Sequence, residues 1–254
     1  MTFLKSDLKL RVNWGKMNMK DYLLMSSNSI LNVIRWSPKI HFLPSILIFP
    51  VNICNYDCIM CDCARSNNKA AKISMDFSMM TKLLEDLSAL PYMPIVHFSG
   101  HGEPFVYPEI RKVMYLCRQL KLKYSITTNG YLLDRNVEDL VETRCHGLNV
   151  SLHGTAEYHD RVSKIPGSFE KTIKGLRNLA KKREKQQTRS PLVSINCVIN
   201  NENVLYLKEI VHFFENLPID SVVFQHLAFQ REHLQRGDDF LILEKEKLLS
   251  LIHI

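Results

Sequence analysis

The amino-acid sequence predicts an α/β fold in which six parallel strands form a partial (β/α)6 barrel with the helices outside. Short apolar runs rich in β-branched residues alternate along the chain with segments whose apolar residues recur every three or four positions. Parallel strands need crossover connections of this kind, and right-handed crossovers wind them in one direction. Six units are fewer than the eight of a closed barrel, so we expect a curved, partly open barrel. A flat doubly wound sheet is the alternative.

The strands and helices are predicted from composition and from apolar spacing. The predicted strands cover residues 45–53, 94–99, 123–128, 147–153, 192–199 and 221–227. The predicted helices cover residues 77–87, 110–120, 136–142, 168–179, 204–214 and 244–252. Ser168 follows Pro166 and Gly167 and is predicted as the N-cap of the fourth helix.

The chain divides by pattern into an N-terminal helical appendage, residues 1–44, and the barrel, residues 45–254. Within the appendage, residues 17–36 have an amphipathic helical pattern that ends at Ser37 and Pro38. We expect this helix to cover an edge or an end of the barrel. A membrane-surface role is the alternative, because lysine and arginine residues flank the helix.

Composition favours a cytoplasmic protein. The chain has 254 residues and seven cysteines, and four of these lie between positions 54 and 63. An odd, clustered set fits a reducing compartment better than a disulfide framework. No secretory leader and no membrane-spanning run is evident. The net charge is +7, and the basic run 181–185 is interpreted as a solvated helix end, so we expect no nucleic-acid partner.

Three cysteines with the spacing C-x3-C-x2-C follow the first predicted strand. Cys54, Cys58 and Cys61 therefore lie on one short loop, and the residues between the first two are polar. Cysteine thiolates hold iron–sulfur clusters, and three ligands leave one iron of a 4Fe–4S cluster open. A structural zinc site that includes Cys63 is the alternative, although zinc sites usually combine two separate ligand arms. The remaining cysteines, at positions 117, 145 and 197, are expected to be small buried hydrophobes.

Further polar and glycine-rich segments follow the next three strands. They are residues 100–104, 127–130 and 151–154. Because the carboxyl ends of parallel strands share one edge, all of them should lie on the same rim as the cysteine loop. The glycines are expected to let backbone groups approach a ligand closely, and Glu103 is a candidate to receive a cation.

Over residues 45–227 these segments resemble the radical S-adenosylmethionine (radical SAM) superfamily. The cysteine loop resembles the cluster motif, which makes Cys54, Cys58 and Cys61 the ligands of a 4Fe–4S cluster. The segment Gly100-His101-Gly102-Glu103-Pro104 resembles the Gly-Gly-Glu-Pro segment that binds the amino group of S-adenosylmethionine. His101 stands where glycine is common, but the backbone acceptors of the segment remain.

The resemblance also implies roles for residues at other points of the rim. Asn129 lies in a segment similar to the end of the third strand of the family. Ser151 and Arg161 would meet the ribose or the carboxylate of the cofactor, and Met60 would cover adenine or shield the cluster. For Arg161 the alternative is a surface ion pair with Asp160 or Glu157. The implied cofactor-binding residues are Met60, Gly100, Gly102, Glu103, Pro104, Asn129, Ser151 and Arg161.

The resemblance implies an oxidoreductase reaction that uses both cofactors. S-adenosylmethionine would chelate the open iron, and an electron from the cluster would cleave its carbon–sulfur bond. The resulting 5′-deoxyadenosyl radical would abstract a hydrogen atom from the substrate. An electron donor such as flavodoxin or ferredoxin is expected. The cysteine loop is most similar to the SPASM/peptide-modifying branch, which favours a peptide or protein substrate. A small metabolite or lipid precursor is the first alternative, and a non-catalytic iron–sulfur or zinc binding module is the second.

Two features of the sequence stay without assignment. No cysteine follows Cys197, whereas many peptide-modifying relatives carry a cysteine-rich C-terminal extension with further clusters. Either one cluster is enough, or the chain is a truncated piece of a longer protein, and both interpretations stay open. Cys63 is expected to lie near the cluster without binding it.

Overall fold

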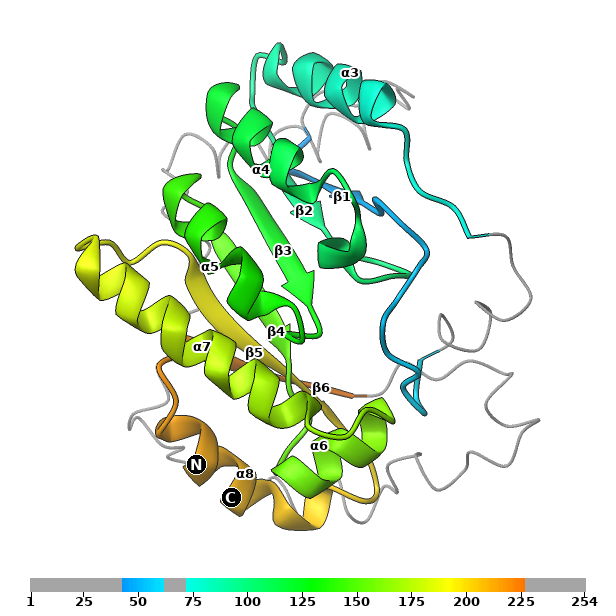
Figure 1. The fold of residues 1–254 in the computed structure, drawn as a ribbon, viewed down its shortest axis with the longest axis vertical. Helices are drawn as coiled ribbons and strands as arrows, with labels where there is room; N and C mark the ends of the chain where they lie inside the picture. The colour runs from blue at the N-terminus through cyan, green and yellow to red at the C-terminus, as the bar shows by residue number, and fades with distance from the viewer. Residues whose placement is uncertain (1–42, 62–71, 227–254) are drawn as a thin grey trace, which may run out of the picture. The chain divides into compact units, whose positions relative to one another are not determined.

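The computed structural model describes residues 43–61 and 72–226 of the chain (Figure 1). The helices and strands below belong to one compact unit that begins at Ser45. The predictions of an N-terminal appendage, of the helix at 244–252 and of the place of Cys63 concern residues outside the described ranges.

Six strands form one parallel sheet in which the spatial order equals the chain order. Each neighbouring pair is parallel, from β1–β2 to β5–β6. Within the described residues β1 and β6 pair on one side only, so the sheet is open. The unreversed order confirms the partial barrel and excludes the doubly wound alternative, in which the strand order reverses. The strands are β1 (Ser45–Ile48), β2 (Ile95–Phe98), β3 (Tyr124–Thr128), β4 (Gly147–Ser151), β5 (Leu192–Ile199) and β6 (Ser221–His226).

The helices cover one face of this sheet (Figure 1). They are α3 (Phe77–Ser88), α4 (Ile110–Gln119), α5 (Leu133–Glu142), α6 (Ala156–Ser163), α7 (Ser168–Lys185) and α8 (Leu207–Glu215), with 3-10 turns η1 (Pro104–Val106) and η2 (Val204–Tyr206). Five of the helices were expected from the sequence, but α6 was missed. Its sequence is mostly polar, and only three of its residues are buried, so the apolar spacing that indicates a helix is weak there.

The two faces of the sheet differ in chemistry. Along β5 every second residue, from Val193 to Ile199, is apolar and buried on the helix side. The register gives the other side, called here the inner face, mainly polar residues. Two hydrogen bonds lie along it, one between His97 Nδ1 and Ser125 Oγ (2.5 Å) and one from Asn149 Nδ2 to Thr127 Oγ1 (3.4 Å). The polar residues of the inner face are His97, Ser125, Thr127, Asn149, Ser151, Ser194 and Asn196.

The first strand is shorter than expected because the chain changes partner after Ile48. Pro50 has no N–H group for a sheet ladder. Its carbonyl instead accepts from Met75 N–H at 2.8 Å, and Val51 forms an antiparallel bridge with Ser74. The chain between β1 and the cysteines is therefore an irregular segment fixed by residues 73–75.

The prediction of Ser168 as a helix N-cap is wrong. Gly167, with φ of +74°, is the N-cap, and α7 begins at Ser168. The Asp160 carboxylate of α6 accepts from the backbone N–H groups of Gly167 (2.6 Å) and Phe169 (2.8 Å). A carboxylate from a neighbouring helix thus satisfies the first N–H groups of α7 and stabilises its positive end.

Candidate functional site

The cysteine loop lies at the carboxyl ends of the strands and is fixed on two sides. On one side, Glu103 N–H donates to the Ile53 carbonyl at 2.9 Å. On the other, Ile59 N–H donates to the Val162 carbonyl at 3.0 Å, and Asp57 N–H donates to the Ser163 carbonyl at 3.4 Å. The loop is therefore held between the segment after β2 and the end of α6.

Tyr56 packs inside this loop and was not recognised from the sequence. Its side chain is buried, and its ring contacts the rings of Tyr131 and His159, with centroids 5.8 and 6.4 Å apart. His159 is itself buried, and burial lowers its pKa to about 4, so it packs as a neutral ring. This aromatic contact is a further anchor between the loop and α6. Sequence spacing did not identify this contact, because Tyr56 and His159 are far apart in the sequence.

The three cysteines of the loop are half-buried and form no disulfide. Burial raises the pKa of the Cys58 thiol, and the neighbouring sulfurs of Cys61 and Cys54 raise it further. Within the described ranges, no three His, Cys, Asp or Glu side chains are grouped to hold a single metal ion. A 4Fe–4S cluster makes a different demand, because each thiolate binds a different iron.

Glu103 is a buried carboxylate at the end of β2. Its Oε1 accepts from Thr128 Oγ1 at 2.7 Å and from Phe105 N–H at 3.1 Å. Its Oε2 accepts from Asn129 N–H at 2.7 Å. Burial raises the pKa of Glu103 to about 7, although these hydrogen bonds lower it. No lysine or arginine of the described part of the chain pairs with this carboxylate. A cationic ligand would stabilise its ionised form.

Asn129, directly after β3, joins Glu103 to the cysteine loop. Its backbone N–H holds Glu103, and its side-chain Nδ2 donates to Asn55 Oδ1 at 2.8 Å and to Cys54 Sγ at 3.7 Å. The structure thus brings together the residues that the sequence placed on the ends of the first three strands. The part of Asn55 was not recognised, because nothing in its spacing distinguishes it from any other loop asparagine.

The glycines after β2 make room for the chain itself. Gly100 has φ of +110°, and a Cβ there would lie 1.9 Å from the Phe49 ring. A Cβ at Gly102 would lie 2.4 Å from the Val51 carbonyl oxygen and 2.8 Å from that of Ile53. The close approach expected toward a ligand is therefore made toward the segment that carries the cysteines. Pro104, the next residue but one, is buried and begins η1.

Arg161 and Ser151 belong to the other half of the rim, and Met60 lies half-buried in the cysteine loop. The Arg161 guanidinium forms a two-pronged ion pair with Glu202, with N–O distances of 2.9 and 3.0 Å. It also lies over the Tyr158 ring, 5.2 Å from its centroid. The sequence suggested Asp160 or Glu157 as the ion-pair partner of Arg161, whereas the structure pairs Arg161 with Glu202. Ser151 ends β4 on the inner face, opposite Asn196.

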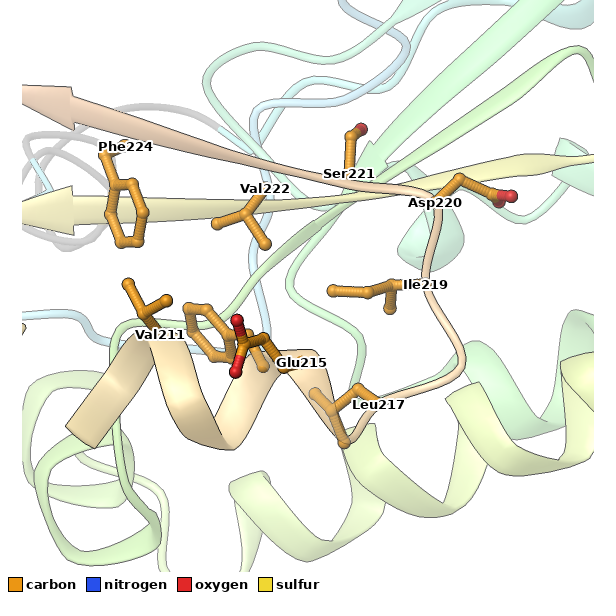
Figure 2. A pocket seen from close by; sticks show the side chains of 9 residues that line it. Val211, Glu215, Leu217, Ile219, Asp220, Ser221, Val222 and Phe224 are labelled. Carbon is orange, nitrogen blue, oxygen red and sulfur yellow. The ribbon is translucent and has the colours of Figure 1, made fainter. Parts of the chain in front are cut away.

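A pocket of about 240 Å³ lies between α8 and β6, away from the rim. Figure 2 shows Val222 and Phe224 of the strand facing Val211 of the helix, while Ser221 points to the opposite side. The pocket is mainly apolar and is formed at the end of α8 and the first half of β6. It contains none of the residues expected to be functional.

None of the helices between residues 72 and 226 has both the length and the apolar composition that a membrane-spanning helix requires.

Comparison with known families and sequences gives one family match and several similar proteins. The model of the radical SAM superfamily matches residues 48–214. A Pyrococcus furiosus protein named tungsten-containing aldehyde ferredoxin oxidoreductase cofactor-modifying protein is 27% identical over 177 residues, which is 68% of this chain and 49% of that protein. The Fe-coproporphyrin III synthase of Methanosarcina barkeri is 27% identical over 199 residues, 76% of this chain and 46% of that protein. The chain thus spans about half the length of these relatives.

Among solved structures, Streptococcus suis SuiB has a similar fold. The structure bound to S-adenosylmethionine has a TM-score of 0.66 and 19% sequence identity, over 90% of this chain and 49% of SuiB. The structure bound to the precursor peptide SuiA has a TM-score of 0.66 and 18% identity, over 93% of this chain and 51% of SuiB. At this identity the comparison supports the fold alone.

Proposed function

Because the chain belongs to the radical SAM superfamily, we propose that Cys54, Cys58 and Cys61 bind a 4Fe–4S cluster and that the rim beside them binds S-adenosylmethionine. The observation that carries this proposal is the hydrogen-bonded link from Glu103 through Asn129 to Cys54. It joins a buried carboxylate that lacks a cation, within the described part of the chain, to one of the three thiols.

The residues of the rim divide the binding of the cofactor between them. Glu103 receives its amino group, the cationic ligand that this buried carboxylate lacks. Gly100, Gly102 and Pro104 shape the backbone around Glu103. Asn129 holds the carboxylate in place. Met60 shields the cluster from its position between two cysteines. Ser151 and Arg161 contact the ribose or carboxylate, for which Arg161 has to exchange Glu202 for the ligand.

With both groups bound, the site would supply one-electron reductive cleavage of S-adenosylmethionine and hydrogen-atom abstraction from the substrate. The chain contributes by holding the cofactor and by excluding water from the inner face. The electron comes from a one-electron donor such as flavodoxin or ferredoxin. Thiols that have to stay reduced for cluster binding suit a cytoplasmic enzyme.

We propose a peptide as the substrate, bound along the inner face. The polar side chains of this face are uncharged, including His97, because burial lowers its pKa and favours the neutral ring. They therefore suit amide groups better than carboxylates. The Ser194 hydroxyl is buried and has no hydrogen-bond partner within the described residues. The SuiB structure with its precursor peptide shows that a protein of similar fold binds a peptide.

A tetrapyrrole or another cofactor precursor is the second candidate substrate. It is favoured by the names of the two sequence relatives, a cofactor-modifying protein and an Fe-coproporphyrin III synthase. The inner face argues against it, because its described residues include no lysine or arginine that would pair with the carboxylates of such a ring.

The proposal is tested by anaerobic reconstitution of the full chain with iron and sulfide. We expect about four irons per chain, absorption typical of an iron–sulfur cluster, and 5′-deoxyadenosine after addition of dithionite and S-adenosylmethionine. A protein that binds zinc and no cluster would contradict the proposal. Titration with an iron coproporphyrin, followed by its absorption band, tests the second candidate, because binding at micromolar concentration would favour it over a peptide.

A further inference from the structure

The backbone N–H and both side-chain polar atoms of Asn129 have hydrogen-bond partners in the structure, and these partners fix the orientation of the side-chain amide. Its side-chain Oδ1 accepts from Tyr131 N–H at 3.0 Å. An Nδ2 group in that position would face another donor, so the amide can point only one way. Its Nδ2 group is thereby directed at Asn55 Oδ1 and at Cys54 Sγ.

The Cys54 sulfur accepts a second N–H group from the loop itself. Tyr56 N–H lies 3.4 Å from Cys54 Sγ. Hydrogen bonds to ligand sulfurs are among the factors that set the potential of an iron–sulfur cluster, because they stabilise its more negative, reduced state. The donor from Tyr56 belongs to the backbone of the loop, whereas the donor from Asn129 comes from a different strand.

We propose that Asn129 is a positioning residue that raises the reduction potential of the cluster through its N–H···S hydrogen bond to Cys54. Through its backbone N–H it also couples the cluster to the Glu103 carboxylate. The couple concerned transfers one electron: the oxidised cluster takes it from a low-potential one-electron donor, and no bond of the protein is made or broken. This inference rests on the proposed function, because it requires the cluster.

The test compares reconstituted wild-type protein with Asn129→Leu, which has a similar shape but no side-chain donor. The backbone N–H to Glu103 remains in this variant. Asn136→Ala is the control, because Asn136 of α5 donates to the carbonyl of Leu132, the N-cap of that helix, and lies outside the rim. Iron and sulfide content are measured by chemical analysis. The midpoint potential of the cluster is measured by electron paramagnetic resonance at defined solution potentials.

We expect Asn129→Leu to keep its iron but to show a reduced-to-oxidised ratio about three to ten times lower at the same solution potential. A tenfold change corresponds to about 59 mV for one electron. The control should match the wild type. A full cluster with an unchanged potential in Asn129→Leu would overturn the inference, whereas a wild type that assembles no cluster would overturn the proposed function.

A second measurement does not depend on the stability of a variant. In wild-type protein with ¹⁵N in its asparagine side-chain amides, pulsed paramagnetic resonance of the reduced cluster should detect a coupled ¹⁵N nucleus. The control Asn136→Ala should retain this coupling. Absence of any coupling in the wild type would contradict the hydrogen bond and therefore the inference.

Discussion

The two halves of the rim hold their charged groups in opposite ways. At the ends of β1 to β3, Glu103 is buried, accepts three hydrogen bonds and, in the described part of the chain, has no cation beside it. At the end of β4 and along α6, Arg161 and Asp160 are already engaged, by Glu202 and by the first turn of α7. The proposed function therefore expects more of the binding energy of the cofactor from the first half of the rim than from the second.

The partners of a charged residue near a site indicate whether that residue is available to a ligand. From the sequence, Glu103 and Arg161 were both candidates for the cofactor, and a surface ion pair was the alternative for Arg161. A buried carboxylate without a cation carries a desolvation penalty that a cationic ligand would offset, whereas at the half-exposed Arg161 the ion pair with Glu202 already offsets this penalty.

The largest effect is expected for Cys58→Ala, which removes one thiolate from the loop. Two ligands on a half-exposed loop should not retain a cluster, so reconstitution should yield essentially no bound iron and no 5′-deoxyadenosine. Cys117→Ala is the matched control, because Cys117 is buried in α4 on the helix side of the sheet. An unchanged iron content in Cys58→Ala would refute the assignment of this ligand.

The next effect is expected for Glu103→Gln, which removes the charge from the first half of the rim. Affinity for S-adenosylmethionine should fall about a hundredfold, or about 2.8 kcal/mol, because the amino group loses its buried carboxylate. Iron content should stay at the wild-type level. Glu109→Gln is the control, since Glu109 pairs with Lys112 at the surface. Equal affinity of the Glu103 variant and the wild type, measured by isothermal titration, would remove Glu103 from the site.

A smaller effect is expected in the pH dependence of stability of the metal-free protein. The folded-state pKa of Glu103 is raised to about 7. The folded protein therefore keeps a proton that the unfolded chain has lost, and stability falls as the pH rises through about 7. Buried His153 and His159 act in the opposite direction, because burial lowers their pKa to about 3 and about 4. Their contribution makes the folded protein less stable as the pH falls below the pKa of histidine in the unfolded chain.

Comparison of Glu103→Gln with the wild type separates these contributions, because the histidines are common to both proteins. From pH 6 to pH 8 the wild type should lose about 1 kcal/mol more of its free energy of unfolding than the variant does, because only the wild type has the titrating carboxyl group. Urea unfolding of both proteins at the two pH values measures this difference. A constant difference would show that Glu103 is already ionised in the folded protein at pH 6.

The smallest effect is expected for Arg161→Ala in the second half of the rim. Because the guanidinium has to give up Glu202 to reach a ligand, affinity for S-adenosylmethionine should fall only about threefold. Stability should fall by less than about 1 kcal/mol, as for other half-exposed pairs. Glu202→Gln, which releases the guanidinium, should leave the affinity equal or higher. A hundredfold loss in Arg161→Ala would place both halves of the rim in the site equally.

The sequence was sufficient for the strands, their direction and the common rim, because those follow from alternation and crossover rules. It was insufficient where a contact joins distant segments. The pairing of Arg161 with Glu202, the capping of α7 by Asp160 and the packing of Tyr56 on His159 depend on how α6 lies against its neighbours. The polar sequence of α6 hides the helix itself, so none of these contacts could be expected. Gly102 is a further example. A close backbone approach was expected there, but toward a ligand and not toward the carbonyl oxygens of Val51 and Ile53.

The most direct test of the cluster assignment is Mössbauer spectroscopy of the ⁵⁷Fe-reconstituted full chain, with and without S-adenosylmethionine. We expect a 4Fe–4S cluster in which one iron of the four, the one without a cysteine ligand, changes its signal when S-adenosylmethionine is added. The same sample of Glu103→Gln should show the cluster without this change at equal cofactor concentration. Four equivalent irons that do not respond to the cofactor in the wild type would contradict the account.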